Sequence, residues 1–246
     1  MINLKNKRPN ILVIGDLMID HYLWGSCEKI SPEAPVQIVN INSENILLGG
    51  AGNVINNLKK LGAKVDVISV LGECKISQDI GQLLRSIDVD TQYLITQKDR
   101  LASKKSRIVA SQQQVVRFDR ESKEAISKIS ETKILDFFNK IVSNYECILL
   151  SDYGKGVLTR KLTQSLIKIA NNHNKKILVD PKGEDFSKYK NAYLLTPNKK
   201  EASAATQIKI TSKETLEQAI IKLKSKCNLA VSLITLSEDG IALLDE

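Results

Sequence analysis

The sequence predicts an α/β protein in which a doubly wound, mainly parallel sheet carries a small lid of β-strands. Short apolar runs alternate along the chain with segments of helical periodicity, which is the order of elements in a parallel sheet. Two further segments alternate apolar and polar residues with no helix between them, as strands outside such a sheet do. The chain has 246 residues, 42% of them hydrophobic, and can therefore bury a substantial core.

The predicted elements follow one another as strand, helix and strand. The apolar run Asn10–Gly15 indicates a buried strand, a helical pattern covers Val54–Leu61 and stops at Gly62, and Lys64–Leu71 indicates the next strand. Right-handed crossovers then place such strands side by side in one sheet. The remaining predicted units are a helix over 78–86, a helix over 132–142 before a strand over 147–151, a helix over 159–171 before a strand over 176–180, a strand over 193–195, and a helix over 213–226 before a strand over 230–236.

Residues 33–48 and 104–119 do not fit this alternation. Pro35–Leu48 and Lys104–Asp119 have the apolar and polar alternation of strands, so we expect them to pair as antiparallel ribbons outside the main sheet and to form a lid. The sequence contains no internal repeat, low-complexity tract or long linker. We therefore expect one domain over residues 1–246 that includes this lid.

Composition limits the partners and the compartment. Four cysteines stand far apart without a CxxC pair, which indicates reduced thiols and a cytoplasmic protein, and no segment is typical of export or of a membrane span. The net charge is +8, but only Arg100–Arg120 concentrates basic residues. No aromatic residue that could stack on a base lies between Lys104, Lys105 and Arg107. We therefore expect no nucleic-acid and no membrane partner, and we assign the basic stretch to a phosphorylated substrate.

The run Leu48–Asn53 (LGGAGN) leads directly into the first predicted helix. Its glycines leave backbone N–H groups uncovered beside the positive end of that helix, where an anion or sugar hydroxyls can bind. The Asn53 amide can both donate and accept hydrogen bonds. Such a glycine-rich turn into a helix is also a common packing solution, so the run taken alone leaves ligand binding and packing open.

Polar residues follow five of the predicted strands. Because the carboxyl ends of parallel strands meet at one edge of a sheet, we expect these residues to line a single cleft. Each of them alone also fits a helix cap or a turn. Asn198 and Glu201 lie one helical turn apart and suit a hydrated Mg²⁺, but they also suit an ordinary helix start with Asn198 as its cap. The five segments are Asp16 with Asp20, Ser151–Gly156, Asp180–Gly183, Thr196–Asn198 with Glu201, and Ser237–Gly240.

Two familiar catalytic features are missing from the sequence. His21 and His173 do not form a catalytic pair, and we interpret His21 as structural. No GxxxxGK[ST] run is present, so any nucleotide binds outside a P-loop.

Taken in order, three motifs resemble those of the ribokinase-like (PfkB) sugar kinases: Gly15-Asp16 with Asp20, Gly49–Asn53, and Asn198–Glu201. Within that family the chain is most similar to the heptose 7-phosphate kinases, which are free-standing or the kinase half of a bifunctional kinase/adenylyltransferase. The resemblance covers essentially the whole chain and implies the ribokinase-like fold. The segments of closest likeness are Ile30–Val36 (ISPEAPV), Gln113-Gln114 with Arg117 and Asp119, Ser151–Gly156 (SDYGKG), Val179–Gly183 (VDPKG) and Leu195–Asn198 (LTPN).

This resemblance implies ATP-dependent phosphorylation of D-glycero-β-D-manno-heptose 7-phosphate at O1, to the 1,7-bisphosphate, for the lipopolysaccharide core. The cofactors it implies are ATP and Mg²⁺, the latter beside Asn198 and Glu201. Kinases of this kind act mainly by positioning and charge neutralisation under a lid. The implied substrate-binding residues are Asp16, Asp20, Gly49, Gly50, Gly52, Asn53, Lys105, Arg107, Gln114, Arg117, Asp119, Asp152 and Lys155. The implied nucleotide-binding residues are Asp180, Lys182, Asn198, Lys199, Lys200, Glu201, Thr235, Ser237 and Gly240.

The sequence departs from the family pattern at one point. The family places its general base in a Gly-Ala-Gly-Asp run at a helix start, expected soon after Leu243–Glu246, and the 246 residues contain no such run. We therefore expect this polypeptide, as a truncated product, to be inactive or nearly so, because loss of the base alone typically costs about 10²- to 10⁴-fold in rate.

Two other functions fit the same residues. One is a ribokinase-like kinase of another sugar or of a nucleoside, which would favour an unphosphorylated substrate, against the basic residues Lys105, Arg107 and Arg117. The other is a non-catalytic sugar- or nucleotide-binding protein, which would bind tightly without turnover. The apolar ribbon Val36–Leu48 also predicts a homodimer in which the lids cross, because an exposed strand face otherwise invites aggregation.

Overall fold

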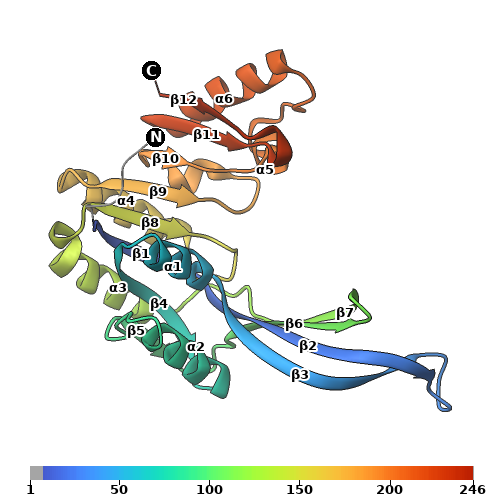
Figure 1. The fold of residues 1–246 in the computed structure, drawn as a ribbon. Helices are drawn as coiled ribbons and strands as arrows, with labels where there is room; N and C mark the ends of the chain where they lie inside the picture. Colours follow the sequence, from blue (N-terminus) through green and yellow to red (C-terminus); the bar gives the residue numbers. More distant parts are fainter. Residues whose placement is uncertain (1–7, 246) are drawn as a thin grey trace.

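The computed structural model describes residues 8–245, so Met1–Lys7 and Glu246 of the predicted domain lie outside the described part. Over this range a main sheet of eight strands has the order β12-β11-β10-β9-β8-β1-β4-β5 (Figure 1). All its pairs are parallel except that of β12 with β11, which confirms the predicted doubly wound, mainly parallel sheet. The strands are β1 (Asn10–Gly15), β4 (Lys64–Gly72), β5 (Leu94–Gln97), β8 (Cys147–Ser151), β9 (Lys176–Asp180), β10 (Leu194–Leu195), β11 (Val231–Thr235) and β12 (Ile241–Leu244).

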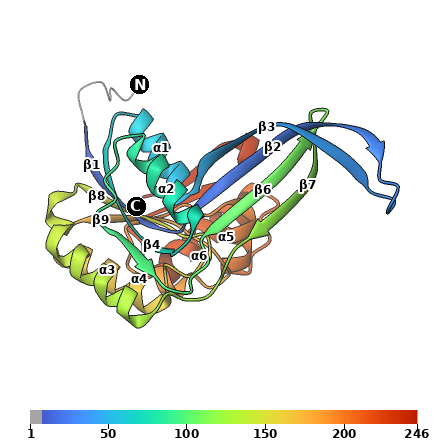
Figure 2. The ribbon, with the colours of Figure 1, turned by 90° about the horizontal axis from the view of Figure 1, so that it is seen from below.

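Helices cover both faces of this sheet (Figure 2). One core lies between the sheet and α1 and α2, where Ile76, Ile80 and Leu84 of α2 recur at helical spacing and are buried. The other core lies between the sheet and α3 to α6, and Phe138 and Leu166 are fully buried in it. The helices are α1 (Ala51–Lys60), α2 (Lys75–Arg85), α3 (Lys128–Ile141), α4 (Arg160–Asn172), α5 (Lys199–Thr206) and α6 (Lys213–Cys227), with short 3₁₀ helices η1 (Val142–Asn144), η2 (Phe186–Tyr189) and η3 (Ser237–Asp239).

A second, smaller sheet projects from the main one, in the order β3-β2-β6-β7 (Figure 1). Its strands β3 (Gln37–Gly50), β6 (Ser103–Ala110) and β7 (Gln113–Arg120) occupy the two segments predicted to form ribbons. Its remaining strand, β2 (Leu17–Ile30), was not predicted, and it separates β3 from β6, so the two predicted segments do not pair with each other. We call these four strands the small sheet.

The unpredicted strand β2 corrects the position of two residues. Asp20 and His21 were expected in a loop after β1, but they lie within β2, which begins one residue after Asp16. His21 is buried and hydrogen-bonded with Ser106 Oγ and Glu44 across the neighbouring strands. This arrangement agrees with the structural interpretation of His21.

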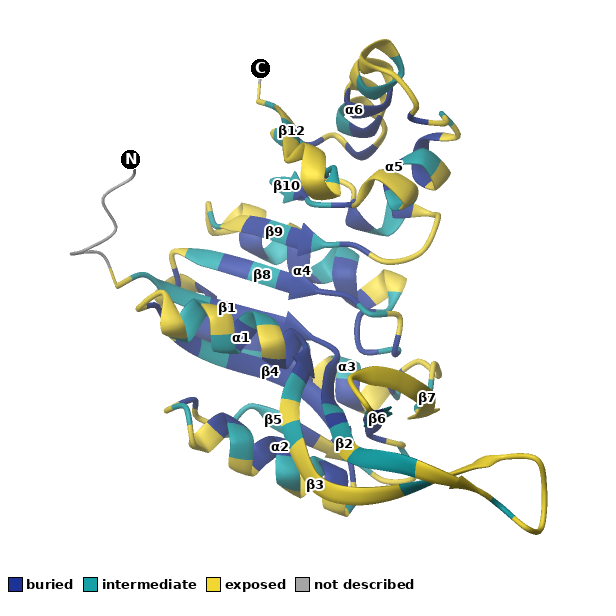
Figure 3. Cartoon of the chain, turned by 45° about the vertical axis from the view of Figure 1, so that its right-hand side comes forward, coloured by how far each residue is buried: buried dark blue, intermediate teal, exposed yellow. Residues whose placement is uncertain are grey.

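The small sheet becomes steadily more exposed with distance from the main sheet (Figure 3). Every residue of β7 is exposed. The part of the chain that the structure describes has no helix both long and apolar enough to pass through a membrane.

Candidate functional site

The predicted polar segments lie at one edge of the main sheet. β11, β10, β9, β8 and β1 are consecutive neighbours and run in the same direction, so their carboxyl ends form a continuous row. This row confirms that the five polar endings share one sheet edge. The small sheet joins the main sheet at the end of the row, directly after β1.

Asp16 organises the backbone at the centre of this edge. The residue is only 1% exposed, and its carboxylate accepts hydrogen bonds from the backbone N–H groups of Tyr153 (2.8 Å), Lys155 (3.1 Å) and Val157 (3.1 Å). Burial raises the pKa of Asp16 above its usual range, although the three N–H groups act in the opposite direction. The Asp16 carbonyl also accepts from the N–H of Ala51 (3.0 Å). Asp16 therefore shapes the site by holding both the loop after β8 and the start of α1.

Two glycines let β3 run directly into α1, so the predicted glycine-rich loop is a strand-to-helix junction. Gly50 has a φ of 58° and stands at the cap position of α1, where no side chain caps the helix. A Cβ on Gly49 would lie 2.3 Å from Oδ2 of Asp20. Gly49 therefore leaves room for the Asp20 carboxylate beside the uncapped N–H groups of α1.

Asp20 belongs to a charged group on one face of the small sheet. Arg107 Nη1 donates to Asp20 Oδ1 at 2.6 Å, and its guanidinium lies 5.2 Å from the ring centre of Tyr22. Lys105 lies on β6, between Asp20 of the neighbouring strand β2 and Asp119 of the neighbouring strand β7. Because alternate residues of a strand share a face, Arg117 lies on this face as well, and it pairs with Asp119.

Gln114 lies apart from that charged group, whereas Asn53 is next to it. Gln114 is exposed beside the turn that joins β6 and β7, at the far end of β7 from Asp119. Asn53 is exposed on α1 and lines a cavity of about 470 Å³ together with Asp20, Tyr22 and Lys60. Asn53 thus shares a cavity with Asp20, another predicted substrate residue.

Asp152 and Lys155 lie in the loop after β8 and are both buried. Asp152 accepts hydrogen bonds from Lys188 Nζ (2.5 Å), the Tyr189 hydroxyl (2.7 Å) and the Gly154 N–H (2.8 Å). Lys155 Nζ lies 2.6 Å from Glu121 Oε2. Sequence reasoning missed Lys188, Tyr189 and Glu121, because none of the three belongs to a motif selected from the sequence.

The nucleotide-side residues form a second group at the ends of β9, β10 and β11. Lys182 Nζ donates to Glu201 Oε1 at 2.8 Å. Burial, followed by the nearby charge of Glu201, raises the pKa of Asp180 to about 6. The N–H of Thr235 donates to the carbonyl of Pro197, which connects the end of β11 to the start of α5. The remaining predicted residues of this group, Lys199, Lys200, Ser237 and Gly240, are exposed.

Asn198 and Glu201 form a complete capping box at α5. Asn198 Oδ1 accepts from the Glu201 N–H (2.9 Å), and Glu201 Oε2 accepts from the Asn198 N–H (3.1 Å). The structure thus contains the capping arrangement that the sequence had left open. No group of three or more His, Cys, Asp and Glu side chains within residues 8–245 is placed to hold a metal ion. The side-chain oxygens of Asn198 and Glu201 suit a Mg²⁺ that keeps its water shell, because each oxygen still has a free lone pair that can accept a hydrogen bond from a metal-bound water.

Tyr153 lies in the predicted polar segment Ser151–Gly156, but it was not among the predicted site residues. Its ring is half-buried, with Lys105 Nζ 6.0 Å from the ring centre. Burial raises the pKa of Tyr153, and the charges of Asp180, Asp20 and Glu201 raise it further. The charges that raise the pKa of Tyr153 thus come from Asp20 on β2, from Asp180 at the end of β9 and from Glu201 at the start of α5.

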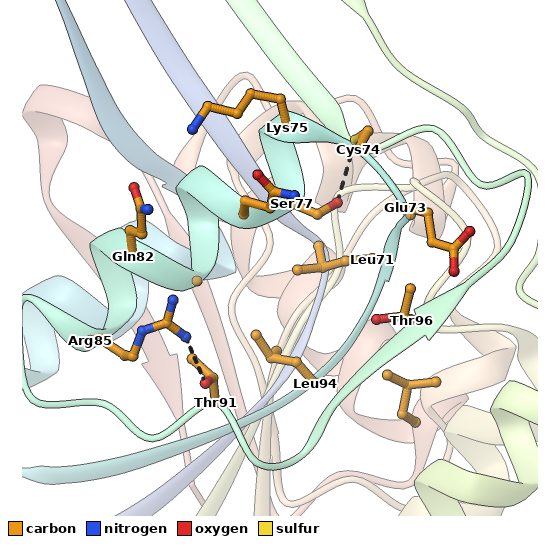
Figure 4. Close-up of a pocket in the computed structure, with 14 residues that line it drawn as sticks. Leu71, Glu73, Cys74, Lys75, Ser77, Gln82, Arg85, Thr91, Leu94 and Thr96 are labelled. Atoms are coloured by element: carbon orange, nitrogen blue, oxygen red, sulfur yellow. Dashed lines mark hydrogen bonds between the residues drawn. The ribbon is translucent and has the colours of Figure 1, made fainter.

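Another cavity, of about 750 Å³, lies between α2 and β5 and shares no residue with the predicted set (Figure 4). Cys74 lies on its wall with its thiol 3.5 Å from Ser77 Oγ, and Arg85 donates to the Thr91 hydroxyl. Burial raises the pKa of Cys74, but hydrogen bonds from Ser77, Ala102 and Ile76 together outweigh it and lower the pKa below its usual range.

Solved structures of low sequence identity share this fold. The chain superposes on Arabidopsis thaliana ribokinase complexed with ribose and ATP with a TM-score of 0.72 and 18% identity, over 98% of this chain and 76% of that one. It superposes on the tetrameric inhibited form of phosphofructokinase-2 from Escherichia coli with a TM-score of 0.76 and 18% identity, over 97% and 77% of the two chains. These structures confirm the ribokinase-like fold.

Relatives of higher identity carry the name bifunctional protein HldE. The one from Aliarcobacter butzleri is 59% identical over 241 residues, which are 98% of this chain and 51% of the relative. The one from Sulfurimonas denitrificans is 56% identical over 243 residues, 99% and 51% of the two chains. The chain thus spans about half the length of these relatives. The model of the pfkB family of carbohydrate kinases matches residues 8–246, and this chain belongs to that family.

Proposed function

We propose that this chain supplies the substrate-binding residues of a kinase that transfers the γ-phosphoryl group of ATP to O1 of D-glycero-β-D-manno-heptose 7-phosphate, in the cytoplasm and for the lipopolysaccharide core. Membership of the carbohydrate kinase family and the likeness to HldE proteins support a sugar kinase of this kind. The observation that carries the proposal is the continuous row of carboxyl ends from β1 to β11, with Asp16 and the small sheet at one end and Lys182 and Glu201 farther along it. A sugar beside Asp20 and a triphosphate beside Glu201 would meet there.

The sugar would bind between the start of α1 and the charged face of the small sheet. Asp20 can accept hydrogen bonds from sugar hydroxyls, and the uncapped N–H groups of α1 can donate to them. Lys105 is close to both Lys155 and Arg117, whose charges, after burial, lower the pKa of Lys105. A cluster of three cations with only part of its charge balanced favours a substrate that already carries a phosphate group.

The nucleotide would bind along the ends of β9, β10 and β11. Lys182 is exposed and can exchange its partner Glu201 for a phosphate oxygen. A Mg²⁺ bound when the nucleotide is present would neutralise phosphate charge, and Asn198 and Glu201 would orient its waters. The exposed Lys199 and Lys200 lie on the first turn of the same helix.

Calorimetry on the 246-residue chain tests this proposal, with a coupled assay for ADP as its second measurement. We expect heptose 7-phosphate to bind more tightly than the same heptose without its phosphate, and ADP release to be slow because the sequence contains no Gly-x-Gly-Asp run. Preference for an unphosphorylated sugar would favour a kinase of another substrate. Tight binding of sugar and ATP with no turnover would favour a binding protein, if turnover is also absent when this chain replaces the matching half of a full-length relative. Turnover at an ordinary rate by the 246 residues alone would refute our placement of the general base.

We also propose that the chain forms a homodimer through the small sheet. Large apolar side chains on this sheet are exposed, which is unusual for a surface that faces only water. The neighbouring phosphofructokinase-2 structure is described as a tetramer, so proteins of this fold do assemble. The exposed apolar residues of this region are Trp24, Ile30, Val36, Ile38, Ile41, Leu47, Val115, Val116 and Phe118.

A further inference from the structure

Arg100 binds three separate segments of the chain at the point where the small sheet joins the main one. It lies between β5 and β6, on the segment that enters the small sheet. Its guanidinium donates to the carbonyl of Val70 at 3.3 Å, of Glu124 at 3.1 Å and of Lys155 at 2.5 Å. These acceptors belong to the end of β4, to the segment between β7 and α3, and to the loop after β8.

Only an arginine can make this set of contacts. The guanidinium carries five N–H donors in a fixed plane, so it reaches three acceptors at once, whereas a lysine amine at the same place would satisfy fewer of them. Burial lowers the pKa of Arg100, while the charges of Asp16 and Glu124 raise it. Arginine stays protonated under such conditions, so the three hydrogen bonds are charge-assisted.

Lys155 is held at both of its ends by segments that lead to the small sheet. Its carbonyl accepts from Arg100 on the entering segment, and its Nζ pairs with Glu121 directly after β7 on the returning segment. The next carbonyl, that of Gly156, accepts from the N–H of Ile126 at 3.0 Å. The position of the Lys155 amine therefore depends on the small sheet and on the Arg100 guanidinium.

We propose that Arg100 is a positioning residue that sets Lys155 in the substrate site. The consequence for binding rests on the proposed function, in which Lys155 is one of three cations that favour a phosphorylated sugar. Without Arg100, three backbone carbonyls lose the guanidinium donor, and the loop after β8 loses one of its links to the segments that lead to the small sheet. Lys155 then occupies its position for a smaller fraction of the time, and ligands that need its charge bind more weakly.

Hydrogen exchange on the ligand-free 246-residue chain tests the positioning itself. In Arg100→Ala we expect the backbone N–H groups of residues 152–157 to exchange about tenfold faster, the effect of losing one charge-assisted hydrogen bond. Arg100→Lys keeps the charge and part of the bonding and should exchange at an intermediate rate. Arg85→Ala is the matched control, since Arg85 is exposed and donates only to Thr91. Unchanged exchange of residues 152–157 in both Arg100 variants would overturn the proposal, and Arg100→Lys decides the matter if Arg100→Ala fails to fold.

A double-mutant cycle tests the effect on binding, with heptose 7-phosphate as the probe. We expect Arg100→Ala to weaken its affinity about tenfold in the wild-type background but less than about twofold beside Lys155→Ala, because Arg100 acts through Lys155. An equal loss in both backgrounds would show a general structural role and overturn the proposal. If the wild-type chain does not bind this probe, the proposed function has failed, and the exchange experiment still decides the role of Arg100.

Discussion

At the scale of single residues, Asp16 was predicted to bind the substrate with its carboxylate. In the structure this carboxylate accepts hydrogen bonds from backbone N–H groups of the loop after β8. We expect Asp16→Asn to destabilise the protein by about 1–3 kcal/mol, because an amide replaces one acceptor oxygen by a donor that faces backbone N–H groups in a buried place. Urea unfolding would measure this change. Asp90→Asn is the control, since Asp90 accepts a single hydrogen bond, from the N–H of Gln92, at an exposed position. Equal unfolding midpoints for Asp16→Asn and the wild type would contradict the role of Asp16.

Asp180 gives the site a dependence on pH. Its pKa is raised to about 6 in the folded state, so between its usual value near 4 and 6 the folded protein binds a proton that the unfolded chain does not. The stability that this proton contributes is present at low pH and is lost as pH rises through 6. We expect Asp180→Asn to raise the free energy of unfolding by about 1 kcal/mol at pH 7, and to lose that advantage near pH 4.

Unfolding of Asp180→Asn and the wild type across pH 4–8 would test this expectation. Asp136→Asn, on the exposed side of α3, serves as the control. A stability difference that stays constant over this pH range would show that the effect of the substitution does not come from ionisation of Asp180.

At the scale of elements, two capping boxes separate a structural role from a binding role. Asn198 caps α5 at the predicted nucleotide side, and Ser212 caps α6 away from the predicted residues. We expect Asn198→Ala and Ser212→Ala each to destabilise the protein by about 1 kcal/mol, the usual cost of losing a cap. Only Asn198→Ala should also weaken binding of an ATP analogue with Mg²⁺, measured by calorimetry. Equal binding by both variants would leave Asn198 as a helix cap alone.

The elements also show what the sequence can reveal. The buried parallel strands and the helices were predictable because each has the apolar period of its own geometry. Strand β2 was missed because Leu17, Met18 and Ile19 are all buried at its base, and its later residues face a charged site, so neither part has a simple alternation. At the site, the ends of the predicted strands indicated the sheet edge at which the polar side chains lie. Contacts of Arg100, Lys188 and Tyr189 come from tertiary pairing across 36 to 55 residues, for which local pattern carries no signal.

At the scale of the whole molecule, the two sheets depend on each other at the loop after β8. Asp16 holds this loop from β1, and Glu121 holds it from the end of β7. A movement of the small sheet would therefore shift Lys155 together with the charged face that carries Lys105 and Arg107. Substrate contacts made by the small sheet and by the main sheet should accordingly form and break together.

The proposed dimer depends on the small sheet as a whole. We expect the wild-type chain to sediment as a dimer at micromolar concentration and the double variant Val116→Asp/Phe118→Asp to raise the dissociation constant about 100-fold or more, because two carboxylates would lose water in an apolar contact. These residues lie two apart on β7, hence on one face, and are 44% and 51% exposed. Ile221→Asp, on α6, replaces a side chain that is 58% exposed and should leave the dimer intact. A wild-type chain that sediments as a monomer at tens of micromolar would refute the dimer, and a dimer equally weakened by Ile221→Asp would place its interface elsewhere.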